Sequence, residues 1–287
     1  MKKLAAAVLL AAALPAAAAV AIAPGKSSFE FADGRGRPDR PLKVYTYRPA
    51  ACDASCPLQF VIPGVQRNAA DYRDYWVASA DRYRFIVLAP EFSKSLWPHA
   101  AAYNLGDVEA QAEPANWSFS AIEHLFDAVR TTQTDYRIFG HSAGGQFVHR
   151  MLLFLPDNRA SVLVSANPGW YTMPEWRKAD AQDPFPYSLV GARVGKPELE
   201  RALARRYVLM LGTSDVDPDA DNLSKTPGAE REGASRYQRG QAFFKAAGAA
   251  AETLKVPFAW KLVEVPGVAH QGSAMSRHAA DLLYGHP

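Results

Sequence analysis

The chain has 287 residues, of which 48% are hydrophobic and 21% are charged. This composition supplies enough apolar side chains for a core and excludes an intrinsically disordered protein. Lysine and arginine number 32 against 29 aspartates and glutamates, which gives a formal charge of +3. Nucleic acids and anionic membranes bind clustered basic residues, so this balance argues against either as the main partner. The composition indicates a soluble enzyme or a binder of small molecules.

The N-terminus has the pattern of a secretory signal peptide. Two lysines precede an apolar run from Leu4 to Leu14, which Pro15 ends before a string of alanines. Cleavage after Ala19 fits the small-residue rule and leaves residues 20–287 as a single domain. An uncleaved anchor is the alternative, because the apolar stretch has about the length of a membrane span. Alanine is only weakly hydrophobic, so we expect a secreted or periplasmic protein without a stable membrane anchor.

Export affects how the two cysteines are interpreted, because thiols persist as disulfides in oxidising compartments. Cys52 and Cys56 are predicted to pair with each other and close a small loop. A zinc site is the weaker alternative, since a structural zinc needs four ligands and only two thiols are present. We therefore expect a disulfide and no metal here.

Short apolar runs bounded by Gly, Pro or Asp recur along the chain and predict strands. Such near-continuous hydrophobicity is typical of strands that are buried on both faces of a parallel sheet. The first two runs flank a turn-rich segment and are expected to pair antiparallel. The predicted strands are Ser27 to Phe31, Leu42 to Tyr47, Leu58 to Ile62, Phe85 to Ala89, Tyr136 to Phe139, Ser161 to Ser165, Tyr207 to Leu211 and Phe258 to Val265.

Helical patterns lie between these runs. Ser120 and Glu123 form a capping-box pattern before apolar residues at helical spacing. A second helix is predicted after Ser142 and ends at Pro156, which cannot continue it. Alternating strands and helices indicate a doubly wound α/β fold with a mostly parallel sheet and helices on both faces. The aromatic, proline-rich region within residues 167–205 is interpreted either as a short cap or substrate loop, or as a surface loop.

The motif Gly140-His141-Ser142-Ala143-Gly144 lies between a predicted strand and a predicted helix. This is the strand-turn-helix setting of a nucleophile elbow, in which the serine occupies a strained conformation and exposes its hydroxyl above the sheet. The glycines two positions to either side allow strand and helix to approach closely. The sequence therefore predicts Ser142 as a catalytic nucleophile, with a plain glycine-rich turn as the alternative.

At this motif the chain resembles the α/β-hydrolase superfamily, and within it the secreted polyhydroxybutyrate depolymerase and feruloyl esterase-like serine esterases. The resemblance extends over nearly the whole mature chain. It also includes the run Pro63-Gly64-Val65-Gln66-Arg67-Asn68 and the run Pro266-Gly267-Val268-Ala269-His270. The sequence departs from the family at Pro63, where a histidine is usual. The resemblance implies an α/β-hydrolase fold and a Ser, acid, His order of catalytic residues along the chain.

A serine hydroxyl needs a base oriented by a carboxylate. His270 follows the last predicted strand, where the resemblance places the catalytic histidine, and His278 is the reserve candidate. Asp215 fits the expected position after the preceding strand, and Asp217 is the alternative acid. Aspartates at alternate positions also suggest a calcium loop, but the central glycine and closing glutamate of that motif are missing here.

Backbone N–H groups of Ala143 and, by resemblance, Val65 are expected to form the oxyanion hole. Trp117, Trp170 and Tyr171 are candidates for the substrate pocket. The leading hypothesis is an exported serine esterase that acts on small or oligomeric esters through an acyl-enzyme and needs no cofactor. Because no adsorption module follows His270, we expect weak binding to solid polymer. A serine peptidase of the same fold and a non-catalytic binding protein are the alternatives.

Overall fold

The computed structural model describes residues 19–176 and 183–285. They form an eight-stranded sheet in the order β1-β2-β4-β3-β5-β6-β7-β8. β2 pairs antiparallel with β1, as predicted, and with β4, whereas the other neighbours run parallel. The strands are β1 (Gly25–Phe31), β2 (Leu42–Arg48), β3 (Leu58–Ile62), β4 (Ile86–Glu91), β5 (Tyr136–His141), β6 (Ala160–Ala166), β7 (Tyr207–Gly212) and β8 (Trp260–Val265).

Each predicted strand is present, with ends shifted by at most two residues. The reason is visible in the central strands, whose side chains are buried on both faces of the sheet. In β3, Phe60 and Ile62 face one hydrophobic cluster, and Val61 faces the other. A strand covered on both faces needs a continuous apolar run, and this is the signal that the sequence carries.

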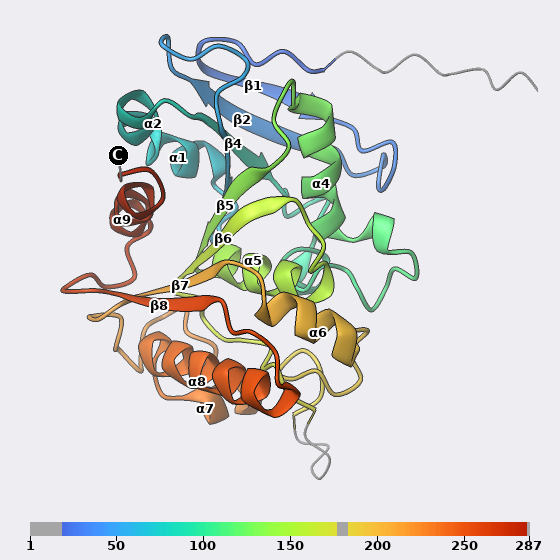
Figure 1. Ribbon diagram of the computed structural model, residues 1–287, viewed down its shortest axis with the longest axis vertical. Helices are drawn as coiled ribbons and strands as arrows, with labels where there is room; N and C mark the ends of the chain where they lie inside the picture. Colours follow the sequence, from blue (N-terminus) through green and yellow to red (C-terminus); the bar gives the residue numbers. More distant parts are fainter. Residues whose placement is uncertain (1–18, 177–182, 286–287) are drawn as a thin grey trace, which may run out of the picture.

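Helices cover both faces of the sheet, as Figure 1 shows. The first cluster contains side chains of α4, α5, α6 and α8, and the second contains side chains of α1, α2 and α9. The predicted doubly wound α/β architecture is therefore confirmed. The helices are α1 (Ala69–Asp74), α2 (Val77–Tyr83), α3 (His99–Ala102), the 3-10 helix η1 (Pro114–Asn116), α4 (Ser118–Val129), α5 (Ala143–Phe154), α6 (Lys196–Leu203), α7 (Pro227–Glu232), α8 (Arg236–Leu254) and α9 (Gly272–Tyr284).

The start of α4 differs from the prediction. The helix begins at Ser118, and the predicted capping box of Ser120 and Glu123 does not form. The Ser120 hydroxyl donates instead to the carbonyl of Pro114 at 2.6 Å. Glu123 accepts hydrogen bonds from the backbone and side chain of Arg159. Tertiary contacts thus use both side chains that the local pattern assigned to the cap.

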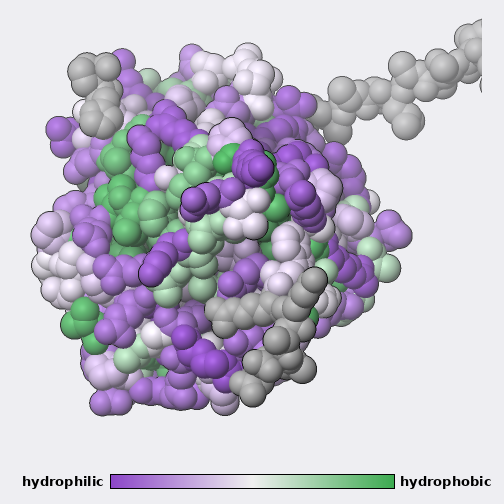
Figure 2. All heavy atoms as spheres, turned by 60° about the horizontal axis from the view of Figure 1, so that its bottom comes forward, coloured by the Kyte–Doolittle hydropathy of each residue, from purple (hydrophilic) through white to green (hydrophobic). Residues whose placement is uncertain are grey.

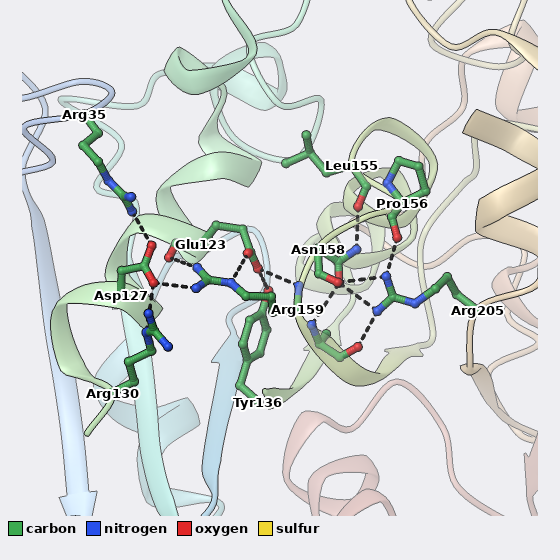
Figure 3. Close-up of polar contacts among 11 residues, drawn as sticks. Arg35, Glu123, Asp127, Arg130, Tyr136, Leu155, Pro156, Asn158, Arg159 and Arg205 are labelled. Carbon is green, nitrogen blue, oxygen red and sulfur yellow. Dashed lines mark hydrogen bonds and ion pairs between the residues drawn. The ribbon is translucent and has the colours of Figure 1, made fainter. Parts of the chain in front are cut away.

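The contact between Glu123 and Arg159 is part of an ionic network that connects α4 to the segment before β6 (Figure 3). Arg159 lies between Glu123, at 2.8 Å, and Asp127, at 2.5 Å. Arg35 and Arg130 also contact Asp127, at 2.8 Å and 3.0 Å. The hydrogen bond from Arg159, supported by Arg35, lowers the pKa of Asp127 to about 2 although partial burial opposes this. The network therefore holds an ionised carboxylate at this end of α4.

The predicted disulfide between Cys52 and Cys56 is present, with 5.8 Å between the two Cα atoms. It closes the loop between β2 and β3. The predicted signal peptide, residues 1–19, lies outside the described residues except for Ala19. In residues 19–176 and 183–285, none of the helices combines the length and apolar character needed to cross a bilayer.

The surface is mainly polar on the face drawn in Figure 2, where hydrophobic side chains form one larger patch and a few smaller groups. Among the described residues, the large hydrophobic side chains that remain exposed are those of Val65, Leu96, Trp176 and Val216. Val65 follows β3 and Val216 follows β7, so both lie where parallel strands end at the same edge of the sheet. In open α/β sheets this edge is where ligands bind.

Candidate active site

Ser142 lies at the sharp turn between β5 and α5. Its φ of 58° and ψ of −119° fall outside the regions that L-residues prefer, so the backbone is strained there. A Cβ atom on Gly140 would lie 2.1 Å from the Gly144 carbonyl oxygen, and one on Gly144 would lie 2.1 Å from the Ile62 carbonyl oxygen. Only glycine fits at these two positions. The two glycines therefore allow the close approach of strand and helix that the sharp turn at Ser142 requires.

The structure brings the side chains of Ser142, His270 and Asp215 together in one hydrogen-bonded chain. His270 Nε2 lies 3.0 Å from Ser142 Oγ, and His270 Nδ1 lies 2.7 Å from Asp215 Oδ2. A carboxylate only accepts, so Nδ1 carries the proton and Nε2 accepts from the serine hydroxyl. The side chain of Asp215 is 4% exposed and that of His270 is 19% exposed. The histidine is thus anchored in the protein interior and open toward the solvent side.

The two reserve candidates lie elsewhere. Asp217 is exposed, and its Oδ1 accepts the backbone N–H of Asp219 at 2.9 Å. His278 is exposed on α9. In the part of the chain that the structure describes, no group of three or more His, Cys, Asp or Glu side chains is placed to hold a metal ion.

The predicted oxyanion hole consists of backbone groups beside Ser142. Gly64, which precedes Val65, lies so close that a Cβ atom there would be 3.7 Å from the Ser142 Cβ atom. Within residues 19–176 and 183–285, the N–H groups of Val65 and Ala143 donate no hydrogen bond to the protein. Ala143 opens α5, where the helix dipole also favours negative charge. Both groups are available to an oxygen atom that becomes negative near Ser142.

Hydrogen bonds of Tyr103 and Arg67 fix the loop that carries Val65. The Tyr103 hydroxyl donates to the Pro63 carbonyl at 2.6 Å. The Arg67 guanidinium donates to the carbonyls of Phe92 and His99, at 2.6 Å and 3.0 Å, and lies 3.6 Å above the Tyr103 ring. These contacts fix the loop even though the usual histidine of the family is replaced by Pro63.

A buried pair, Tyr72 and His141, lies beneath the site. The Tyr72 hydroxyl is 2.8 Å from His141 Nδ1, and the His141 ring centroid is 4.6 Å from that of His270. Burial lowers the pKa of His141 well below its usual value, and the nearby His270 and Arg236 lower it further. His141 is therefore neutral and adds no positive charge next to His270.

The predicted pocket residues have different positions. Trp117 is buried and packs edge-to-face on Phe154, the last residue of α5, about 18 Å along the helix from Ser142. Tyr171 is fully buried and stacks on Phe243 with 4.5 Å between ring centroids. Both side chains belong to the core, contrary to the expectation that they line a pocket. The partly exposed Trp170 lies over the Arg150 guanidinium at 4.2 Å.

The region 167–205 begins beside the site. Asn167 Nδ2 donates to the Ala269 carbonyl at 3.1 Å, and its Oδ1 accepts the Gly212 N–H at 2.8 Å. Asn167 thus joins the ends of β6 and β7 to the loop before His270. The last part of the region is α6, which contacts α5 and α8 as an ordinary crossover helix and not as a cap. Residues 177–182 lie outside the described part.

Sequence reasoning missed Tyr72 and the role of His141, because neither has a local signal. Tyr72 lies on a short helix, and 69 residues separate it from His141. Gly64 and Gly272 also lie close to the Tyr72 hydroxyl: Cβ atoms there would be 3.0 Å and 3.1 Å from it.

Comparison with known proteins places this geometry in context. Neither a family model nor a curated protein matches the sequence. The solved structure of poly(aspartic acid) hydrolase-1 from Sphingomonas sp. KT-1 is 38% identical, with a TM-score of 0.83, over 92% of this chain and 100% of that one. The poly(3-hydroxybutyrate) depolymerase from Bordetella parapertussis is 34% identical, with a TM-score of 0.85, over 92% of this chain and 90% of that one.

More distant structures share the fold. The S-formylglutathione hydrolase from Agrobacterium tumefaciens is 14% identical, with a TM-score of 0.57, over 92% of this chain and 95% of that one. The structures at 38% and 34% identity are both hydrolases that match almost along their full length. The chain therefore belongs to the α/β-hydrolase family, in the group that contains poly(3-hydroxybutyrate) depolymerase and poly(aspartic acid) hydrolase.

Proposed function

We propose that this chain is a serine hydrolase that cleaves carboxylic esters through an acyl-enzyme intermediate. The observation that carries the proposal is the continuous hydrogen-bonded line from Ser142 through His270 to Asp215, at 3.0 Å and 2.7 Å. A strained elbow supports it, as do the backbone N–H groups of Val65 and Ala143, which have no acceptor in the described part of the chain. Membership of a family of hydrolases is consistent with this chemistry.

In the first step, Ser142 Oγ attacks the ester carbonyl while His270 Nε2 takes its proton. The carbonyl oxygen becomes negative and accepts hydrogen bonds from the N–H groups of Val65 and Ala143. Asp215 stabilises the imidazolium and holds its tautomer. His270 then gives the proton to the departing alkoxide, so the ester C–O bond breaks and the acyl group remains on Ser142.

In the second step, His270 removes a proton from water, which attacks the acyl-enzyme. The proton returns to Ser142 Oγ as the carboxylic acid leaves. Val65 and Val216, each 51% exposed, lie on the loops that carry the oxyanion donor and the acid. Exposed apolar side chains on these two loops suit substrates with an aliphatic or aromatic part, such as esters of hydroxy acids.

Amide hydrolysis is the second candidate. It is favoured by the 38% identity to an enzyme whose polymer, poly(aspartic acid), is linked by amide bonds. The same groups would act, with His270 protonating a leaving amine. Amides need that protonation more than esters do, because an amide anion is a poorer leaving group than an alkoxide.

A substrate panel with a matched variant tests both candidates. It comprises p-nitrophenyl esters of increasing acyl length, feruloyl esters, hydroxybutyrate oligomers, p-nitroanilides and soluble poly(aspartic acid). We expect ester cleavage that Ser142→Ala lowers by about 10⁴-fold or more. Amide cleavage without ester cleavage would support the second candidate, and hydrolysis that survives Ser142→Ala would refute both.

We further propose that residues 20–287 act as a single exported domain. The leader pattern and the disulfide between Cys52 and Cys56 support a secreted or periplasmic location. N-terminal sequencing of the protein recovered from the medium or periplasm of an exporting host tests this. We expect Val20 as the first residue, and recovery only in the cytosol, with an intact leader, would refute it.

A further inference from the structure

The carboxylate of Asp215 has two oxygen atoms, and only one of them faces His270. The other, Oδ1, lies 3.2 Å from Nη1 of Arg236. Both side chains are enclosed by protein, with 4% of Asp215 and 1% of Arg236 exposed. The structure thus places a fully buried guanidinium against the candidate catalytic acid.

Arg236 is itself held in a fixed orientation. It is the first residue of α8, and Nη2 donates a short hydrogen bond to the side-chain oxygen of Asn222. The next residue, Tyr237, donates its backbone N–H to the Asp215 carbonyl at 3.2 Å. Ser235 caps the helix by accepting the N–H of Gln238 at 3.3 Å. The start of α8 therefore holds Asp215 by its main chain and by its carboxylate.

Two physical effects follow from this arrangement. A carboxylate that bonds only to an imidazole is free to rotate about its last torsion, and a second charged donor on the other oxygen removes that freedom. A buried negative charge also needs a compensating partner, because its desolvation otherwise destabilises the fold. Arg236 provides both the orientation and the compensation, while Oδ2 stays directed at His270 Nδ1.

We propose that Arg236 is a positioning residue that orients Asp215 for its contact with His270. This inference rests on the proposed function, because it assigns the acid role to Asp215. Arg236 is only 1% exposed and is bonded to the Asp215 carboxylate, so it acts through that carboxylate. Its effect on the reaction therefore exists only while Asp215 is ionised and bonded to His270.

A double-mutant cycle tests this dependence. The variants are Arg236→Met, Asp215→Asn and the double variant, and the readout is the rate at which a fluorophosphonate labels Ser142. Labelling reports activation of the serine and does not require the natural substrate. We expect a loss of about 10- to 100-fold for Arg236→Met and of about 10⁴-fold for Asp215→Asn. The double variant should stay within about threefold of Asp215→Asn alone.

Arg239 provides the matched control. It is a buried arginine one turn later on α8, and it donates to the carbonyls of Gly233, Gly169 and Ser224 and not to Asp215. Arg239→Met should lower the labelling rate by the same factor in the wild-type and Asp215→Asn backgrounds. If Arg236→Met behaves in this additive way, its role is structural and the proposal is overturned.

Arg236→Lys covers the case in which Arg236→Met does not fold. Lysine keeps the charge and loses the two-pronged contact, so we expect a loss of roughly threefold to tenfold that disappears in the Asp215→Asn background. Failure of the proposed function gives a different result: Ser142→Ala would be labelled as fast as the wild type. Specific labelling of Ser142 with additive losses would overturn the role of Arg236 alone, and a wild-type protein that takes no label would overturn both.

Discussion

Gly144 provides a sharp test of how the elbow is built. In Gly144→Ala, the new methyl carbon would lie 2.1 Å from the Ile62 carbonyl oxygen and 2.7 Å from that of Pro63. Real Cβ atoms essentially never approach within 3.0 Å, so α5 and the end of β3 must separate by roughly 1 Å. Both obstructing atoms belong to the backbone, and no flexible side chain is available to move away. We expect the free energy of unfolding to fall by about 3 kcal/mol or more.

The same movement separates the two sides of the oxyanion hole. Ala143 moves with α5, and Val65 follows β3, so a shift of about 1 Å spoils the geometry for the developing oxyanion. A misplacement of that size costs on the order of 100-fold in rate. Denaturant unfolding and fluorophosphonate labelling of the folded fraction measure the two effects separately.

Gly248 is the matched control for this substitution. It lies in α8, and a Cβ atom there would meet only Phe258 Cε1 at 3.7 Å, which is ordinary contact. Gly248→Ala should therefore stabilise the protein by about 0.5–1 kcal/mol and leave labelling unchanged. A Gly144→Ala protein as stable and as reactive as the wild type would refute this account of the elbow.

Three further outcomes are expected. Asp215→Asn should lower turnover by about 10⁴-fold and Asp217→Asn by less than threefold, measured with a p-nitrophenyl ester, and the reverse ranking would move the acid role to Asp217. Tyr72→Phe removes the partner of His141, so kcat should fall by about 10-fold with KM within about twofold, and an unchanged kcat would contradict this. The pKa of Asp127 is lowered from 3.8 to about 2 in the folded protein, so its ion pairs stabilise the fold above pH 4 and that stability is lost as pH falls through 2. Asp127→Asn should therefore reduce the free energy of unfolding by about 1–2 kcal/mol at pH 7 and by almost nothing near pH 2, and an equal loss at both pH values would contradict this.

The central strands of the sheet were predictable from sequence because they are buried on both faces. A run such as Leu58 to Ile62 must then be apolar throughout, and turn residues at its ends define its limits. The cap of α4 was not predictable, because Ser120 and Glu123 form tertiary contacts with Pro114 and Arg159. Local patterns identify an element, and long-range contacts decide how its side chains are used.

The candidate site was also predictable only in part from the sequence. The motif around Ser142 and the order of residues after it indicated His270 and narrowed the acid to Asp215 or Asp217. Spacing alone did not separate these two aspartates, since both follow β7 closely and only the fold directs one inward. Arg236 has no sequence signal toward Asp215, because the contact depends on where α8 starts in space.

The aromatic residues show a further limit of sequence reasoning. Trp117 and Tyr171 have the side chains that line apolar pockets, but the same side chains fill cores. Both are buried, whereas Trp170, which directly precedes Tyr171 in the chain, is partly exposed. Composition predicts that aromatic residues pack, and the fold determines what they pack against.

The central claim is that Ser142 forms a covalent acyl-enzyme, and trapping that intermediate tests it most directly. The wild-type protein and Ser142→Ala are mixed with excess p-nitrophenyl ester, quenched in acid within milliseconds to seconds, and measured by intact mass and peptide mapping. We predict one acyl group per wild-type molecule, located on the peptide that contains Ser142, and none on a folded Ser142→Ala protein. An acyl group on another residue, or turnover by Ser142→Ala at the wild-type rate, would contradict the mechanism.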